Sequence, residues 1–263
     1  TVPVMFGDGL EGTLHLPRNA DGKVRPGPWP VVVYLHPYTY ARGYTHRFRI
    51  PFAPLLEQGV AVFSFDQIGF GTRMHEAPRF HERHPRWSLL GKMVEDTGAA
   101  LSALAALENV DSSRLYLLGY GLGGKVALFT AALDDRPAAV AAVSAFAPLR
   151  ISGTDSGTEG LAHYARIHGL IPRLGFFIGQ EQRVPVDYDE IIALAAPRPV
   201  LIVAPTRDRH APVADVAATV GAASRVYALQ GTGSALVLET PAGFGEFTPE
   251  AQKRVSTWVT ELK

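Results

Sequence analysis

A dense cluster of glycines lies between residues 117 and 125, where an apolar run meets a helical pattern. It reads Leu-Leu-Gly-Tyr-Gly-Leu-Gly-Gly-Lys. Gly119, Gly121 and Gly124 fit the G-x-G-x-x-G pattern of dinucleotide-binding loops. That pattern also needs an acidic residue about 20 positions further on to bind a ribose. Residues 140–144 read Val-Ala-Ala-Val-Ser, so the acid is missing and the dinucleotide interpretation is weak.

The same cluster fits two other patterns. From Gly119 to Lys125 it matches the P-loop, but a P-loop requires Ser or Thr as the next residue to bind Mg²⁺, and the sequence has Val126. The third pattern is the nucleophile elbow, G-x-S-x-G, a sharp strand-to-helix turn that lifts a serine above a sheet. Gly121 then stands at the serine position, and Gly119 and Gly123 are the small residues that permit the turn.

The elbow block resembles the Gly-Tyr-Ser-Leu-Gly-Gly of α/β-hydrolase-fold esterases, with one residue changed. Other segments resemble the same family: Leu-His-Pro-Tyr at 35–38, Asp-Gln-Ile-Gly-Phe-Gly at 66–71, and the run 198–204 followed by Asp208. The nearest branch is that of acetyl-xylan esterases and dienelactone hydrolases. The resemblance extends along most of the chain and implies hydrolysis of a carboxylic ester.

The resemblance also implies roles for individual residues. In this family a serine attacks the ester carbonyl, a histidine takes its proton, and an acid orients the histidine. Asp208 matches the acid position. The backbone N–H groups of Tyr38 and Leu122 match the oxyanion hole, which stabilises the negative oxygen. Tyr120, beside the elbow, is a candidate to contact the substrate.

Two parts of this triad are missing. Gly121 has no side chain that could form an acyl intermediate, and loss of a triad serine costs on the order of 10⁶-fold in turnover. The base of this fold follows the last strand, but no histidine follows His210. His210 and His36 are candidates to replace this base. The alternative interpretation is a surface or capping role for His210 and a structural role for His36. We therefore expect an impaired or inactive ester hydrolase, or alternatively a non-catalytic ligand-binding or scaffold protein.

Arginines and histidines crowd the polar segment 66–87. This segment follows the strand predicted at residues 60–65, so it should lie near the same edge of the sheet as the candidate site. Arg73 and Arg79 could there bind a carboxylate such as that of a uronic acid. Four aromatic residues are candidates to stack on sugar faces: Tyr38, Tyr40, Phe70 and Trp87. No H-E-x-x-H pattern is present, and a solvated, salt-bridged loop is the simpler interpretation, so we expect no metal.

Short apolar runs alternate with helical patterns along the chain. The runs predict strands at Val31–Leu35, Val60–Phe65, Leu115–Leu118, Ala139–Ala147, Val200–Ala204 and Ala235–Leu238. The helical patterns cover Phe52–Gln58, Lys92–Leu107, Leu122–Leu133, Pro212–Ala223 and Pro249–Leu262. This alternation predicts a doubly wound, mostly parallel α/β sheet flanked by helices, the architecture of the α/β-hydrolase fold. We expect one domain over residues 1–263, with a cap-like excursion at 150–186.

Composition limits the possible partners. The 263 residues include 25 Lys+Arg and 25 Asp+Glu, so no basic excess points to nucleic acid. No apolar run is long enough to cross a membrane, and the absence of cysteine excludes a thiolate nucleophile. We expect a small-molecule or carbohydrate ester as partner and no cofactor. No signal peptide is visible, and a start at Thr1 is compatible with a processed or trimmed form; oligomeric state and compartment stay open.

Overall fold

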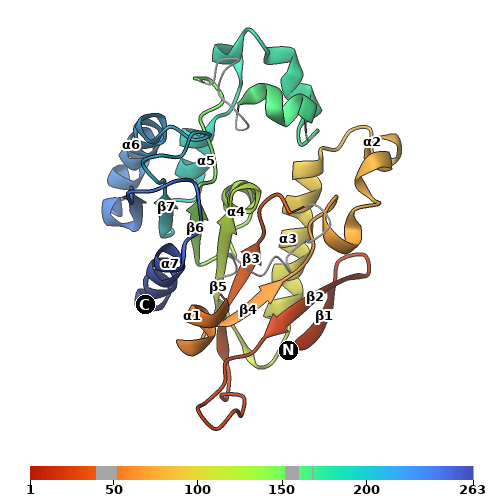
Figure 1. Ribbon diagram of the computed structural model, residues 1–263, viewed down its shortest axis with the longest axis vertical. Coiled ribbons are helices and arrows are strands. Elements are labelled where there is room, and N and C mark those ends of the chain that lie inside the picture. Colours follow the sequence, from red (N-terminus) through yellow and green to blue (C-terminus); the bar gives the residue numbers. More distant parts are fainter. Residues whose placement is uncertain (40–51, 152–159, 168, 263) are drawn as a thin grey trace.

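A central sheet positions the candidate site residues. The computed structural model describes residues 1–39, 52–151, 160–167 and 169–262. Within these ranges, strands form one sheet in the order β1-β2-β4-β3-β5-β6-β7-β8, with helices packed around it (Figure 1). The strands are β1 (Val2–Phe6), β2 (Leu10–His15), β3 (Trp29–Leu35), β4 (Ala61–Ser64), β5 (Val110–Tyr120), β6 (Ala139–Val143), β7 (Val200–Val203) and β8 (Leu236–Glu239). The main helices are α1 (Phe52–Glu57), α3 (Leu89–Ala105), α4 (Leu122–Leu133), α5 (Tyr188–Leu194), α6 (Val213–Leu229) and α7 (Pro249–Glu261).

The predicted fold class is confirmed. The strands from β3 to β8 pair in parallel, whereas β1 and β2 join the sheet in antiparallel pairing. Strands β1 and β2 were not predicted, because their buried positions alternate with exposed or half-buried ones and form no continuous apolar run. Helix α5, which is only seven residues long, was also not predicted.

The two faces of the parallel strands bury two separate hydrophobic clusters. Val31 and Val33 of β3 belong to the cluster that includes α3, α4, α5 and α6. Val32 and Tyr34 of the same strand belong to the cluster that includes α1 and α7. Burial on both faces explains why these strands are apolar at every position. The carboxyl ends of the parallel strands meet at one edge of the sheet, which is where α/β proteins place their sites.

Two long connections extend beyond this edge. The first, after β4, contains the short turns η2 (Gly71–Arg73), η3 (Ala77–Arg79) and α2 (Phe80–Arg83). The second lies between β6 and α5, within the predicted excursion, and contains η4 (His163–Ile167), η5 (Pro172–Phe177) and η6 (Glu181–Arg183). The turns of the second connection stand apart from the sheet at the top of Figure 1. The two connections meet where Leu90 N–H donates to Leu170 C=O at 3.0 Å.

Asp187 anchors both ends of the second connection, and its removal should destabilise the fold. Its buried carboxylate accepts from the N–H groups of Leu149 and Arg150 (both 2.8 Å) and from Tyr188 N–H at 2.7 Å. Asp187→Ala leaves these donors without their acceptor, so we expect the free energy of unfolding to fall by about 3 kcal/mol. Urea denaturation measures the change. Asp215→Ala is the matched control, because this first-turn carboxylate of α6 accepts no hydrogen bond from the described residues; equal losses in the two variants would contradict the anchor.

Candidate active site at the carboxyl edge of the sheet

The glycine cluster forms a sharp turn between β5 and α4. At its centre Gly121 has φ 54° and ψ −117°, a conformation that residues with a side chain rarely adopt. Its N–H donates to Val143 C=O at the end of β6, at 2.9 Å. Tyr120 and Leu122 on either side are buried, whereas Gly121 is only partly buried. The turn therefore presents its central residue at the edge of the sheet.

Close packing accounts for the other glycines of the turn. A Cβ added at Gly119, Gly123 or Gly124 would lie 2.1, 1.9 or 2.6 Å from a neighbouring atom, which is closer than atoms can approach. A Cβ added at Gly121 would meet its nearest neighbour, the Cβ of Pro37, at 3.4 Å, which is close to ordinary van der Waals contact. Of these four glycines, Gly121 alone has room for a side chain. Packing therefore does not explain why it has none.

His36 holds the loop after β3 against the segment after β4. Its Nε2 accepts from Gln67 N–H at 3.0 Å, so its Nδ1 carries the proton and donates to Pro37 C=O at 2.8 Å. Burial lowers the pKa of His36 to about 4. The ring is thus neutral and both nitrogens hold the loop, which argues against His36 as a base and supports its structural interpretation. This loop carries Tyr38, the predicted oxyanion donor.

Lys125 places a positive charge beside Tyr38. It lies one turn into α4 and is fully buried, with Nζ 5.6 Å from the ring centre of Tyr38 and 5.9 Å from that of Tyr164. Together with the N-terminal dipole of α4, which begins at Leu122, this charge favours an anion at the edge. In the sequence, Lys125 stands out only as a P-loop lysine. Its placement was not predicted, because the two tyrosines come from distant segments.

Two further residues at this edge were also missed. His163 from the excursion is almost fully buried, and its ring meets that of Tyr38 edge-on with centroids 5.9 Å apart. Ser144 directly follows β6 in a left-handed conformation, with φ 45°, and its buried Oγ has no hydrogen-bond partner among the described residues. Strained backbone of this kind concentrates at functional sites. An isolated histidine or serine carries no spacing signal that would have revealed either residue.

Asp208, the predicted acid, is buried beyond the end of β7 and against the loop that follows β8. Its Oδ1 accepts from His210 N–H at 2.9 Å, and a Cβ added at Gly245 would lie 2.4 Å from its Oδ2. Tyr120 Oη donates to Gly245 C=O at 2.7 Å, which ties this loop to β5. Asp208 thus lies beside the loop from which the resembled family takes its base, where residues 243–246 are Gly-Phe-Gly-Glu.

His210 is oriented toward its chain neighbour. The Nε–H of Arg209 donates to Nε2 of the His210 ring at 3.1 Å, and the ring is half-buried. This bond occupies the nitrogen that a base would use to accept a proton. The role of His210 as a base stays a prediction without support from this geometry.

The two predicted carboxylate-binding arginines differ in their surroundings. Arg73 is buried, and its guanidinium donates to both carboxylate oxygens of Glu76 (2.8 and 2.7 Å) and to Asp96 at 2.7 Å. These two carboxylates already neutralise its charge and tie the segment to α3, which argues against the predicted contact with a substrate. Arg79 is exposed at the end of η3 and keeps its predicted role.

The predicted sugar-binding aromatic residues differ in their exposure and contacts. The ring of Tyr38 packs on Phe70 with centroids 6.2 Å apart, and Phe70 is itself buried, so its predicted contact with sugar loses support. Trp87 is 46% exposed and keeps its predicted role as a contact for a sugar face. Tyr40 lies outside the described residues.

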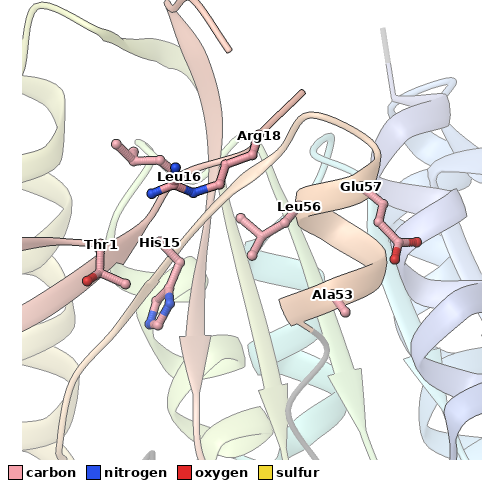
Figure 2. A pocket seen from close by; sticks show the side chains of 7 residues that line it. All are labelled: Thr1, His15, Leu16, Arg18, Ala53, Leu56 and Glu57. Atoms are coloured by element: carbon pink, nitrogen blue, oxygen red, sulfur yellow. The ribbon is translucent and has the colours of Figure 1, made fainter. Parts of the chain in front are cut away.

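A cavity of about 400 Å³ at the other end of the sheet is not the candidate site (Figure 2). His15, which lines it, pairs with Val62 near the start of β4, so the cavity lies at the amino ends of the parallel strands. The ring of His15 packs on Phe52 with centroids 4.5 Å apart, and burial lowers its pKa. Open parallel sheets bind their ligands at the opposite, carboxyl edge.

The part of the chain that the structure describes contains neither a group of metal-binding side chains nor a helix that could span a membrane. No three or more His, Cys, Asp or Glu side chains are grouped to hold a metal ion. No helix there has the length and apolar character needed to cross a bilayer.

Strand order and the turn after β5 together define an α/β-hydrolase-type fold. The chain belongs to the glucuronyl esterase family, because the family model described as "Glucuronyl esterase, fungi" matches residues 12–231. This membership leaves the dinucleotide and P-loop interpretations of the glycine cluster without support.

Solved structures and curated relatives agree with this class. The chain is similar to a glucuronoyl esterase of carbohydrate esterase family 15 from Caldicellulosiruptor kristjansonii, with TM-score 0.76 and 21% identity over 95% of this chain and 71% of that chain. A glucuronoyl esterase from Solibacter usitatus gives TM-score 0.77 and 18% identity, covering 98% and 80% of the two chains. Carbohydrate esterase MZ0003, from an unknown prokaryotic organism, is 26% identical over 174 residues, 65% of this chain and 40% of that relative. Hydrolase LUC6 of a Fusarium species is 32% identical over 151 residues, 56% of this chain and 33% of its own length. The matches thus span two fifths or less of these two relatives.

Substitutions at the turn should show which of its glycines is required by close packing. Gly123→Ala places a methyl group 1.9 Å from Leu35 C=O, so we expect it to destabilise the fold by about 3 kcal/mol or more, or to prevent folding. Gly121→Ala has space for its methyl group and should cost only the backbone strain, about 1–2 kcal/mol. Thermal unfolding followed by circular dichroism measures both. A larger loss at 121 than at 123 would contradict this account of the turn.

Stability should fall in mild acid because of His36. Its ordinary pKa is 6.5 and its folded pKa is about 4, so below pH 6.5 the unfolded chain binds a proton that the folded chain does not. The contribution is complete above pH 6.5 and is lost as the pH falls toward 4, amounting to about 2 kcal/mol by pH 5. Urea unfolding at pH 7 and pH 5 measures it. His36→Gln should reduce the pH dependence by that amount, and His75→Gln, at an exposed site, should not; identical dependence in both variants would refute the assignment.

Proposed function

We propose that the chain carries the acyl-transfer site of a carbohydrate esterase, with Gly121 at the nucleophile position and ester hydrolysis impaired as a result. The observation that carries this proposal is the turn after β5. Among its four glycines, only Gly121 could accept a side chain, and the chain reverses there at the carboxyl edge. Membership of the glucuronyl esterase family supports a carbohydrate ester as the substrate class.

The remaining groups suit stabilisation of a negative oxygen. An ester carbonyl above Gly121 would receive hydrogen bonds from the N–H groups of Leu122 and Tyr38. The dipole of α4 and the buried charge of Lys125 favour the oxyanion, because both present positive potential to the edge. Without a side chain at position 121 no acyl-enzyme forms, and attack falls to water. Asp208 keeps the acid position in this proposal.

The acyl group separates two possible substrates. The motifs resemble a branch that includes acetyl-xylan esterases, and this resemblance implies an acetyl ester as substrate. The glucuronyl esterase family favours an ester of a uronic acid. We propose the uronoyl ester, because the family model covers residues 12–231 and the branch rests on short motifs.

A second candidate function is binding without turnover. It is favoured by the combination of Gly121 with a neutral, fully bonded His36 and with the absence of histidine after His210 in the sequence. Such a site keeps its preference for a polarised carbonyl or a carboxylate but has neither nucleophile nor base at the usual positions. A chain of this kind would retain affinity for the ester or for its acid product.

Replacing Gly121 by serine distinguishes these functions. We expect the unaltered chain to be at background rate with p-nitrophenyl acetate and with benzyl glucuronate, whereas Gly121→Ser should show a burst of acyl-enzyme followed by slow release, because the usual base is missing. Stopped-flow absorbance and intact mass measure the burst, and Gly121→Ala is the matched control without a hydroxyl.

Each other outcome has a definite meaning. Steady hydrolysis by the unaltered chain would refute the claim that position 121 disables it. No burst from Gly121→Ser, together with retained binding of glucuronate, would favour the binding protein. A higher burst rate with p-nitrophenyl acetate than with the glucuronate ester, after correction for leaving-group reactivity, would favour the acetyl substrate.

A further inference from the structure

A second cavity lies between the two long connections. Its volume is about 540 Å³, and it is lined by residues just before α3 and by residues at the start of η5. None of the candidate catalytic residues lines it. The side chains that matter for its chemistry are His81, Arg86 and Trp87 on one wall and Arg173 on the other.

Trp87 gives this cavity an aromatic surface. It is 46% exposed, whereas Trp258 is 7% exposed and Trp29 is half-buried with its indole N–H bonded to Arg25 C=O. A tryptophan left this open on a folded chain loses the free energy of burial, so its position in a cavity points to a ligand that covers it. The flat indole face suits the C–H face of a sugar ring.

The two arginines that line the cavity favour an anion. Arg86 and Arg173 are exposed, and within the described ranges neither forms an ion pair or a hydrogen bond to an acceptor, unlike Arg73 or Arg198. No Asp or Glu lines the cavity. A guanidinium group matches a carboxylate with two parallel hydrogen bonds, so two of them on opposite walls suit a small carboxylate ligand.

His81 adds a polar group to the same wall. Its Nε2 is buried and has no hydrogen-bond partner among the described residues. A Cβ added at Gly169, in the opposite connection, would lie 3.9 Å from this nitrogen. Buried ring nitrogens are normally bonded, so an orphaned one beside a cavity is consistent with a missing partner.

Backbone hydrogen bonds link the residues that line this cavity to residues of the candidate active site. Leu90 N–H donates to Leu170 C=O at 3.0 Å, which joins the two connections beside the cavity. Ile171, which lines it, donates its N–H to Tyr164 C=O at 3.1 Å, and the ring of Tyr164 faces Lys125. Backbone hydrogen bonds therefore join the wall of this cavity to Tyr164, whose ring lies beside Lys125 of the candidate site.

We propose that this cavity is a second subsite, which binds a free uronic acid residue of the same polysaccharide that presents its ester to Gly121. Trp87 stacks on the sugar ring, and Arg86 and Arg173 bind its carboxylate. The ester at the turn is uncharged, so the subsite selects a different, unesterified sugar. This inference rests on the proposed function for the polysaccharide, but the binding itself requires no turnover.

Binding measurements on the intact chain test the subsite. Calorimetric titration with D-glucuronate, its methyl ester and D-glucose should give the order glucuronate, ester, glucose, with the uncharged ligands weaker by roughly tenfold or more. Trp87→Ala and Arg173→Ala should each weaken glucuronate binding by roughly tenfold, and added salt should weaken it further. Arg225→Ala, at an exposed arginine of α6, is the matched control and should bind like the unaltered chain.

The fold of each variant is checked by thermal unfolding, and Trp87→Phe should keep much of the binding because it keeps an aromatic face. Unchanged glucuronate affinity in Trp87→Ala and Arg173→Ala would overturn the subsite. Competition by inorganic sulfate that is equally strong in the unaltered chain and in Trp87→Ala would also overturn it, because that outcome describes a general anion site. Binding that depends on Trp87 without a burst from Gly121→Ser would retain the subsite and refute the esterase, and a burst without such binding would do the reverse.

Discussion

The candidate site depends on one steric constraint, the direct packing of the first turn of α4 on the ends of the neighbouring strands. Gly123 lies against the carbonyl oxygen of Leu35, and Gly124 lies against Ala145 beyond the end of β6. Even a methyl group at either position would push the helix away. Because the helix cannot move, its N-terminus is fixed at the carboxyl edge of the sheet, and the chain must reverse sharply at the residue before it.

That fixed helix start organises the electrostatics of the edge. The N-terminal dipole of α4 and the ammonium group of Lys125 both present positive potential, while His36 adds none because burial keeps it neutral. The arrangement favours an anion at this edge of the sheet, where Gly121 has no side chain. Glycine relieves about 1–3 kcal/mol of backbone strain at such a turn, so its presence there favours stability.

Local sequence patterns were most informative where burial is complete. Leu122–Leu133 was predicted with its observed bounds, and the apolar runs gave the parallel strands to within a few residues except for β5, which extends further toward its start. The same approach failed for β1 and β2, since buried positions in these two strands alternate with exposed or half-buried ones. It also offered Arg73 as a ligand contact, because a sequence cannot show that Glu76 and Asp96 already surround that guanidinium.

The sequence by itself determined the fold class and the glycine-rich turn after β5, because these depend on residue type and on short-range spacing. Only the tertiary structure decided which side chains share the edge: Lys125 beside the ring of Tyr38, His163 from the excursion, and Asp208 against the loop after β8. These groups are far apart along the chain, and contacts between distant segments are set by how the helices and loops pack on the sheet. No local pattern encodes that packing.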